Sequence, residues 1–80
     1  MNKNYSTFTF EITHDEDSGM WVAVCDDLST ATEAETYEAL TKRVWEIAPD
    51  MALENGLNVP VDCLRLRFEH VEFADRLTAA

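Results

Sequence analysis

Apolar and polar residues alternate with a period of two near the start of the chain. Phe8, Phe10 and Ile12 fall on one side of an extended segment, and three threonines and a glutamate fall on the other. Because successive side chains of a strand point to opposite faces, the pattern predicts a strand over residues 7–13 with one buried face. Residues 14–19 are polar and end in glycine, so they predict a hairpin loop to a second strand.

The second predicted strand, residues 20–25, is apolar on both of its faces. A strand of this kind lies in the centre of a sheet, or its second face meets a partner. We expect the helix to cover Met20, Val22 and Val24. The opposite, open face of the sheet would then carry Trp21, Ala23 and Cys25, together with Thr7, Thr9, Arg65 and Arg67.

A turn at residues 26–29 and a short third strand at residues 30–33 precede the pattern of a helix. Thr36 is suited to cap its first turn, and Glu35 and Glu38 place negative charge at the positive end of the helix dipole. Apolar residues then recur at spacings of three and four, which is typical of a helix with one buried stripe: Tyr37, Leu40, Val44, Ile47, Ala48 and Met51.

A proline and a glycine indicate where the predicted helix bends and where it ends. Pro49 kinks this helix or begins a second short one, and Gly56 is suited to the left-handed residue after the helix end. Residues 61–69 predict a last strand whose apolar phase slips before Phe73. A bulge at residues 69–70 would reconcile the two phases.

The element order β-β-β-α-β predicts an α+β fold in which one helix packs on one face of a twisted sheet with strand order 3-2-1-4. Eighty residues form a single domain, 1–80, and we expect flexible ends at residues 1–5 and 75–80. The core between helix and sheet is expected to contain Phe8, Phe10, Ile12, Val22, Val24, Leu40, Val44, Ile47, Leu64, Leu66 and Phe68.

Net charge narrows the possible partners. Six Lys and Arg against sixteen Asp and Glu give a formal charge of −10 in a chain of 9.1 kDa. Such a chain is expected to repel nucleic acid and to attract basic proteins. Since the first residues show no apolar run and no stretch has the length of a membrane span, we expect a cytoplasmic protein.

Candidate chemistry is sparse. Cys25 and Cys63 lie too far apart in sequence to predict a zinc site or a disulfide framework. The acidic loop at residues 14–17 lacks the spacing of a calcium loop, so we expect no metal and no cofactor. Asp26, Asp27, Glu33 and Glu35 could hold magnesium only if they converged, and the pattern does not force convergence. We therefore expect no enzyme.

Three ordered motifs resemble the HicB-like group of antitoxin domains. They are W-x-A-x-C-D-D-L (21–28), T-E-A-E-T-x-E-A-L (32–40) and I-A-P-x-M-x-x-x-N (47–55), and the opening F-x-F-x-I-x-x-D-x-D (8–17) fits the same scheme. The resemblance implies a truncated relative of the ribonuclease H fold without its catalytic residues. It also implies a protein that binds a small basic toxin, which cleaves messenger RNA, and masks its active site.

Two functions follow as hypotheses. The first is a non-catalytic module that neutralises a small basic ribonuclease toxin. The second is a self-assembling homo-oligomer, formed through the exposed sheet or the last strand. The residues expected to bind a partner are Trp21, Asp26, Asp27, Glu33, Glu35, Arg65 and Arg67.

Overall fold

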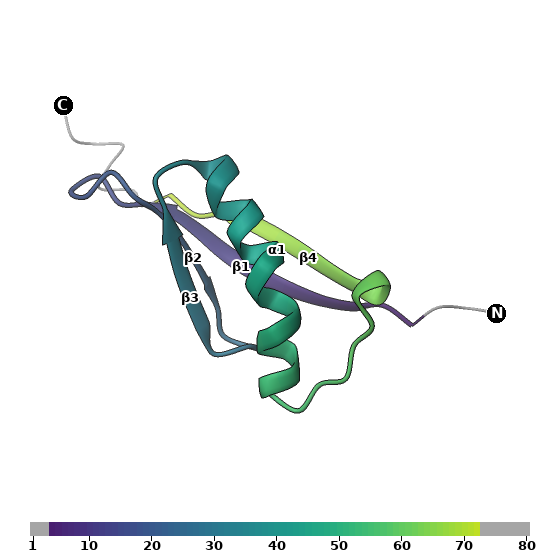
Figure 1. Ribbon diagram of the computed structural model, residues 1–80. Coiled ribbons are helices and arrows are strands. Elements are labelled where there is room, and N and C mark those ends of the chain that lie inside the picture. Colours follow the sequence, from purple (N-terminus) through teal and green to yellow (C-terminus); the bar gives the residue numbers. More distant parts are fainter. Residues whose placement is uncertain (1–3, 73–80) are drawn as a thin grey trace.

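The fold is α+β, with one helix on one face of a four-stranded sheet (Figure 1). The computed structural model describes residues 4–72. Its strands are β1 (Ser6–His14), β2 (Trp21–Cys25), β3 (Thr30–Ala34) and β4 (Leu64–His70), and the helix α1 (Tyr37–Glu54) connects β3 to β4. The sheet order is β3-β2-β1-β4, with β1 antiparallel to β2 and parallel to β4. The predicted fold class and strand order are confirmed.

The two loops that join β1, β2 and β3 are short. In the β1–β2 loop the backbone N–H of Gly19 donates to the carbonyl of Asp15, and Gly19 has a φ of 76°, where a residue without Cβ is not strained. In the β2–β3 turn the N–H of Ser29 donates to the carbonyl of Asp26. The turn therefore carries two aspartates at the end of the central strand β2.

Both predicted helix ends are confirmed. The Thr36 hydroxyl accepts a hydrogen bond of 3.0 Å from the backbone N–H of Ala39, which satisfies one of the free donors of the first turn. At the other end Gly56 has a φ of 77°, the left-handed conformation that glycine tolerates best. The helix runs through Pro49 as one element, so the alternative of two helices is wrong.

The core lies between α1 and the sheet, but β2 faces it differently from the prediction. Ala23 and Cys25 are buried, whereas Val24 is 37% exposed. The register explains this, because Ala23 pairs with the core residue Ile12 and Val24 pairs with the polar Glu11. The residues that are buried are Phe8, Phe10, Ile12, Ala23, Cys25, Leu28, Leu40, Val44, Ala48, Ala52 and Leu64.

The last strand is shorter than predicted. Residues 61–63 form a 3-10 turn after Pro60, and β4 begins only at Leu64. From Leu64 to His70 each residue pairs with one residue of β1, so the expected bulge at residues 69–70 is wrong. The predicted flexible segment 75–80 and the apolar Phe73 lie outside the described residues. Within residues 4–72 no helix is long and apolar enough to cross a membrane.

Candidate functional site

The open face of the sheet, on the side away from α1, is the candidate site. Side chains of paired residues share a face, so the register assigns this surface from the known core residues of β1. Its two central strands, β1 and β2, carry three threonines, two valines and one glutamate, and the outer strands β3 and β4 carry one alanine and four charged residues. The open face comprises Thr7, Thr9, Glu11, Thr13, Val22, Val24, Ala31, Glu33, Arg65, Arg67 and Glu69.

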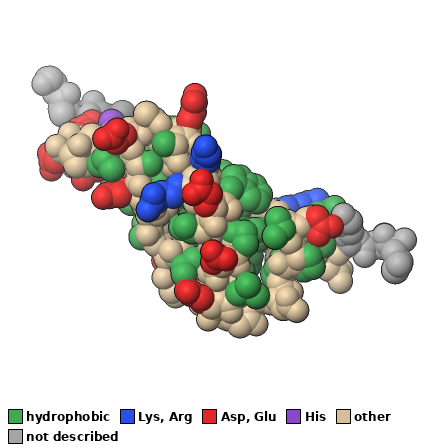
Figure 2. Space-filling view, viewed as in Figure 1, with side chains coloured by type: hydrophobic (Ala, Val, Ile, Leu, Met, Phe, Trp, Pro, Cys, Tyr) green, Lys and Arg blue, Asp and Glu red, His purple; other side chains and the backbone are tan. Residues whose placement is uncertain are grey.

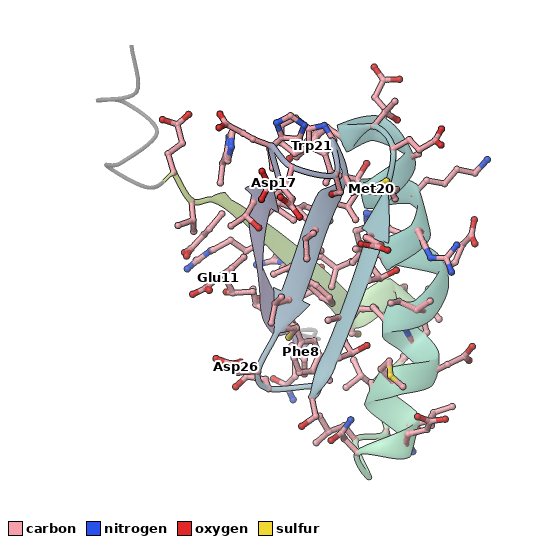
Figure 3. The ribbon with its side chains drawn as sticks, turned by 90° about the vertical axis from the view of Figure 1, so that its left-hand side faces the viewer. Phe8, Glu11, Asp17, Met20, Trp21 and Asp26 are labelled. Carbon is pink, nitrogen blue, oxygen red and sulfur yellow. The ribbon has the colours of Figure 1, made fainter. Side chains whose placement is uncertain are left out.

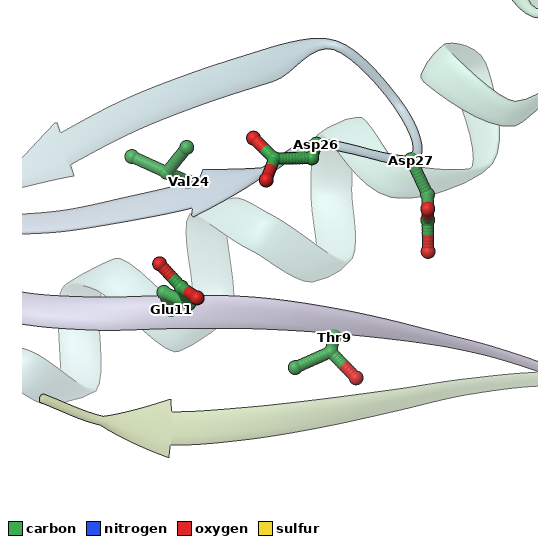
Figure 4. A pocket seen from close by; sticks show the side chains of 5 residues that line it. All are labelled: Thr9, Glu11, Val24, Asp26 and Asp27. Carbon is green, nitrogen blue, oxygen red and sulfur yellow. The ribbon is translucent and has the colours of Figure 1, made fainter.

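A pocket at the β1–β2 boundary concentrates carboxylates on this face (Figure 4). It is lined by Thr9, Glu11, Val24, Asp26 and Asp27. Glu11 lies beside Val24 in the ladder, and the turn after β2 brings both aspartates to the same end of the sheet. Figure 3 shows Glu11 and Asp26 on the side of the sheet that faces away from α1. We call these five residues the acidic pocket.

The chemistry of the acidic pocket suits the binding of a cationic group. Glu11, Asp26 and Asp27 are all exposed. Their carboxylates remain in water and are acceptors for the N–H groups of arginine or lysine. Val24 offers an apolar surface beside them, which can contact the aliphatic stem of such a side chain.

Two arginines occupy the opposite flank of the open face. On the outer strand β4, Arg65 pairs with Thr7 of β1, and Arg67 pairs with Thr9 of β1. The alternation along the last strand predicted that both arginines lie on this face. The guanidinium carbon of Arg65 lies 3.7 Å from the ring centre of Tyr5, a cation–π contact that holds this side chain over the sheet. The open face therefore carries the acidic pocket on β1 and β2, and two arginines and Glu69 on β4.

Trp21 does not lie on the open face, and its expected position there is wrong. It pairs with His14, and the side chain of His14 lies on the same face as that of Ile12, toward α1. Its ring stacks on His14 at 4.6 Å and contacts Tyr37 and His70, each at 5.5 Å between ring centres. Trp21 thus closes the hairpin end of the core, as its position in Figure 3 shows. Local patterns in the sequence did not indicate this cluster, because Tyr37 and His70 lie far along the chain from the hairpin pair of His14 and Trp21.

The remaining predicted site residues lie at two different places. Glu33 is on the open face of β3, opposite Val22. Glu35 is exposed in the bend between β3 and the helix cap, and the register does not place it on either face. Sequence reasoning missed Glu11, although its position on the polar side of the first strand was the signal that could have found it.

Metal-ligating residues do not gather in the described part of the chain. Between residues 4 and 72 no group of three His, Cys, Asp or Glu side chains is placed to hold a metal ion. Cys25 is buried in the core and Cys63 lies in the 3-10 turn, and neither forms a disulfide. The three carboxylates of the acidic pocket form an exposed acidic surface.

A family model described as a domain of unknown function (DUF1902) matches residues 7–77. The chain belongs to this family. The match includes all of α1, β2, β3 and β4 and nearly all of β1, and so contains the whole acidic pocket. No curated protein matches this DUF1902 domain.

A solved structure shares the architecture of the DUF1902 domain. It is a hypothetical protein from the extremely thermophilic bacterium Thermus thermophilus, with 34% sequence identity and a TM-score of 0.71. The alignment covers 85% of this chain and 96% of that chain, so the similarity extends over nearly the whole fold of both.

Proposed function

We propose that this domain is a non-catalytic protein-binding module that neutralises a small basic ribonuclease, as HicB-like antitoxins do. The observation that carries the proposal is the acidic pocket on the open face of the sheet. There Glu11, Asp26 and Asp27 are exposed beside the apolar side chain of Val24, in a chain with a net charge of −10.

Charge gives the proposed partner its chemistry. A ribonuclease that binds RNA presents lysine and arginine to the phosphate backbone. Carboxylates on a neighbouring protein compete for the same cationic groups, and the field of an acidic chain speeds the encounter. The acidic pocket would take one arginine or lysine of the ribonuclease, and occupation of that residue would block its contact with RNA.

The resemblance in the sequence supports the same proposal. The motif W-x-A-x-C-D-D-L includes β2 and the two aspartates of the pocket. Its apolar residues Ala23 and Cys25 are buried under α1 and fix the strand, whereas Asp26 and Asp27 are exposed. The part of the motif that packing does not explain is therefore the part that the proposal assigns to a partner.

A matched pair of variants tests whether the pocket binds. Glu11→Gln/Asp26→Asn/Asp27→Asn removes three charges from the pocket, and Glu46→Gln/Asp50→Asn/Glu54→Gln removes three exposed charges from α1. If a basic protein co-purifies with the wild type, as we propose, we expect the pocket variant to lose roughly tenfold or more of its affinity for that protein. The helix variant should keep most of it.

Titration calorimetry at low and at high salt measures these affinities. The wild-type affinity should fall as salt rises, and the pocket variant should depend less on salt. Equal losses in the two variants would mean that only net charge matters, and the acidic pocket would then not be the binding site.

A further inference from the structure

The last strand, β4, lies at an edge of the sheet with unused backbone groups. The Val71 N–H donates to the Ile12 carbonyl at 2.8 Å, and in a parallel ladder alternate residues bond to the same neighbour. Leu66, Phe68 and His70 therefore direct their N–H and C=O groups away from β1. No other strand among residues 4–72 pairs with this edge.

The core is thinly covered beside the same edge. Leu66 and Phe68 lie on the face toward α1 but are only partly buried, while α1 packs mainly on β2 and β3. The Arg43 guanidinium donates to the Thr32 hydroxyl on β3 at 2.9 Å, which fixes that flank of the helix toward β3. Trp45 lies about 200° around the helix from Arg43, toward the β4 side, and is 45% exposed. Figure 2 shows apolar side chains at the surface alongside α1 on this face.

The sequence of β4 is self-complementary in one antiparallel register. When Phe68 faces Phe68 of the partner subunit, Arg67 lies opposite the partner's Glu69, and the reverse pair forms by symmetry. Opposite charges across a strand pair attract, whereas like charges destabilise it. A register centred on Arg67 or on Glu69 places that residue against its own copy, and one centred on Leu66 places Arg65 against the partner's Arg67.

We propose that β4 pairs with β4 of a second copy of this chain, antiparallel and two-fold symmetric, with Phe68 at the axis. The pairing joins two sheets into one of eight strands and brings the partly buried Leu66 and Phe68 of both copies together. The acidic pocket lies on β1 and β2, one strand in from this seam, and its residues Thr9 and Glu11 pair with Arg67 and Glu69 of β4. The seam contains none of the five pocket residues, so the dimer does not rest on the proposed ribonuclease partner.

The other edge strand, β3, is a weaker candidate for the same pairing. It has five residues, and Glu33 is its one charged residue, so no self-complementary ion pair arises. α1 packs against it, and Arg43 already occupies the Thr32 side chain. Charge and coverage both favour β4.

Charge-swap variants test the register as well as the edge. Arg67→Glu places two glutamates opposite each other across the seam, and Glu69→Arg places two arginines there. Each single variant should weaken the dimer about tenfold or more, and the double variant Arg67→Glu/Glu69→Arg should restore it. Glu33→Arg on β3 makes the same charge change at the other edge, and should leave the dimer intact.

Sedimentation equilibrium over a range of protein concentrations gives the dimer dissociation constants, and circular dichroism confirms that each variant is folded. The proposal is overturned if the folded wild type is a monomer at every concentration. It is also overturned if the double variant is as weak as the single ones, or if Glu33→Arg is the variant that dissociates the dimer.

Discussion

Cys25 and Val24 are neighbours with opposite environments, and they decide which face of β2 meets the helix. Cys25 is 1% exposed and Val24 37%. Both faces of the strand are apolar, so alternation alone could not assign them. The register with β1 assigns Ala23 and Cys25 to the face toward α1, where both are buried. Valine is stable on the open face, since β-branched side chains suit a pleated and partly exposed surface.

A pair of substitutions at these positions tests the assignment. Val24→Thr keeps the branched shape on an exposed face, and we expect it to change the free energy of unfolding by no more than about 0.5 kcal/mol. Cys25→Ser buries a hydroxyl in the core and should cost about 1–3 kcal/mol. Urea denaturation of the two variants measures both values. A larger loss in the Val24 variant would mean that the faces are reversed.

The individual elements follow closely from local sequence. The alternation around Phe10, the glycine of the hairpin and the cap at Thr36 each predicted an element that the structure contains. Two features depended on more distant contacts. The helix continues through Pro49, which the sequence alone could not distinguish from a break into two helices. The strand β4 starts after a 3-10 turn at residues 61–63, and the apolar pattern of this segment did not indicate that turn.

The helix cap gives a prediction at this scale. Thr36→Ala removes the acceptor of the 3.0 Å hydrogen bond from Ala39, so we expect a loss of about 1 kcal/mol in the free energy of unfolding. Thr36→Ser retains the hydroxyl and should be close to the wild type. Thermal unfolding followed by circular dichroism compares the three proteins. Equal stability of the alanine and serine variants would show that the cap contributes little.

The whole molecule divides its surface by charge and by chemistry. One face of the sheet is covered by α1, and the other bears the acidic pocket at the boundary of the central strands β1 and β2 and two arginines on the outer strand β4. Sequence reasoning predicted the turn that carries Asp26 and Asp27 and the face of the β4 arginines, because alternation and turn chemistry are local. It misplaced Trp21 because the face of β2 depends on the packing of a helix that lies later in the chain.

The most direct test of the proposed function is to isolate a basic protein that co-purifies with this chain and to measure its cleavage of RNA. The wild-type chain, added in stoichiometric amounts at low salt, should suppress the cleavage, and high salt should restore it because exposed charge pairs are screened. The variant Glu11→Gln/Asp26→Asn/Asp27→Asn should suppress it much less. Undiminished cleavage in the presence of excess wild-type chain, or a co-purifying protein that does not cleave RNA, would contradict the proposal.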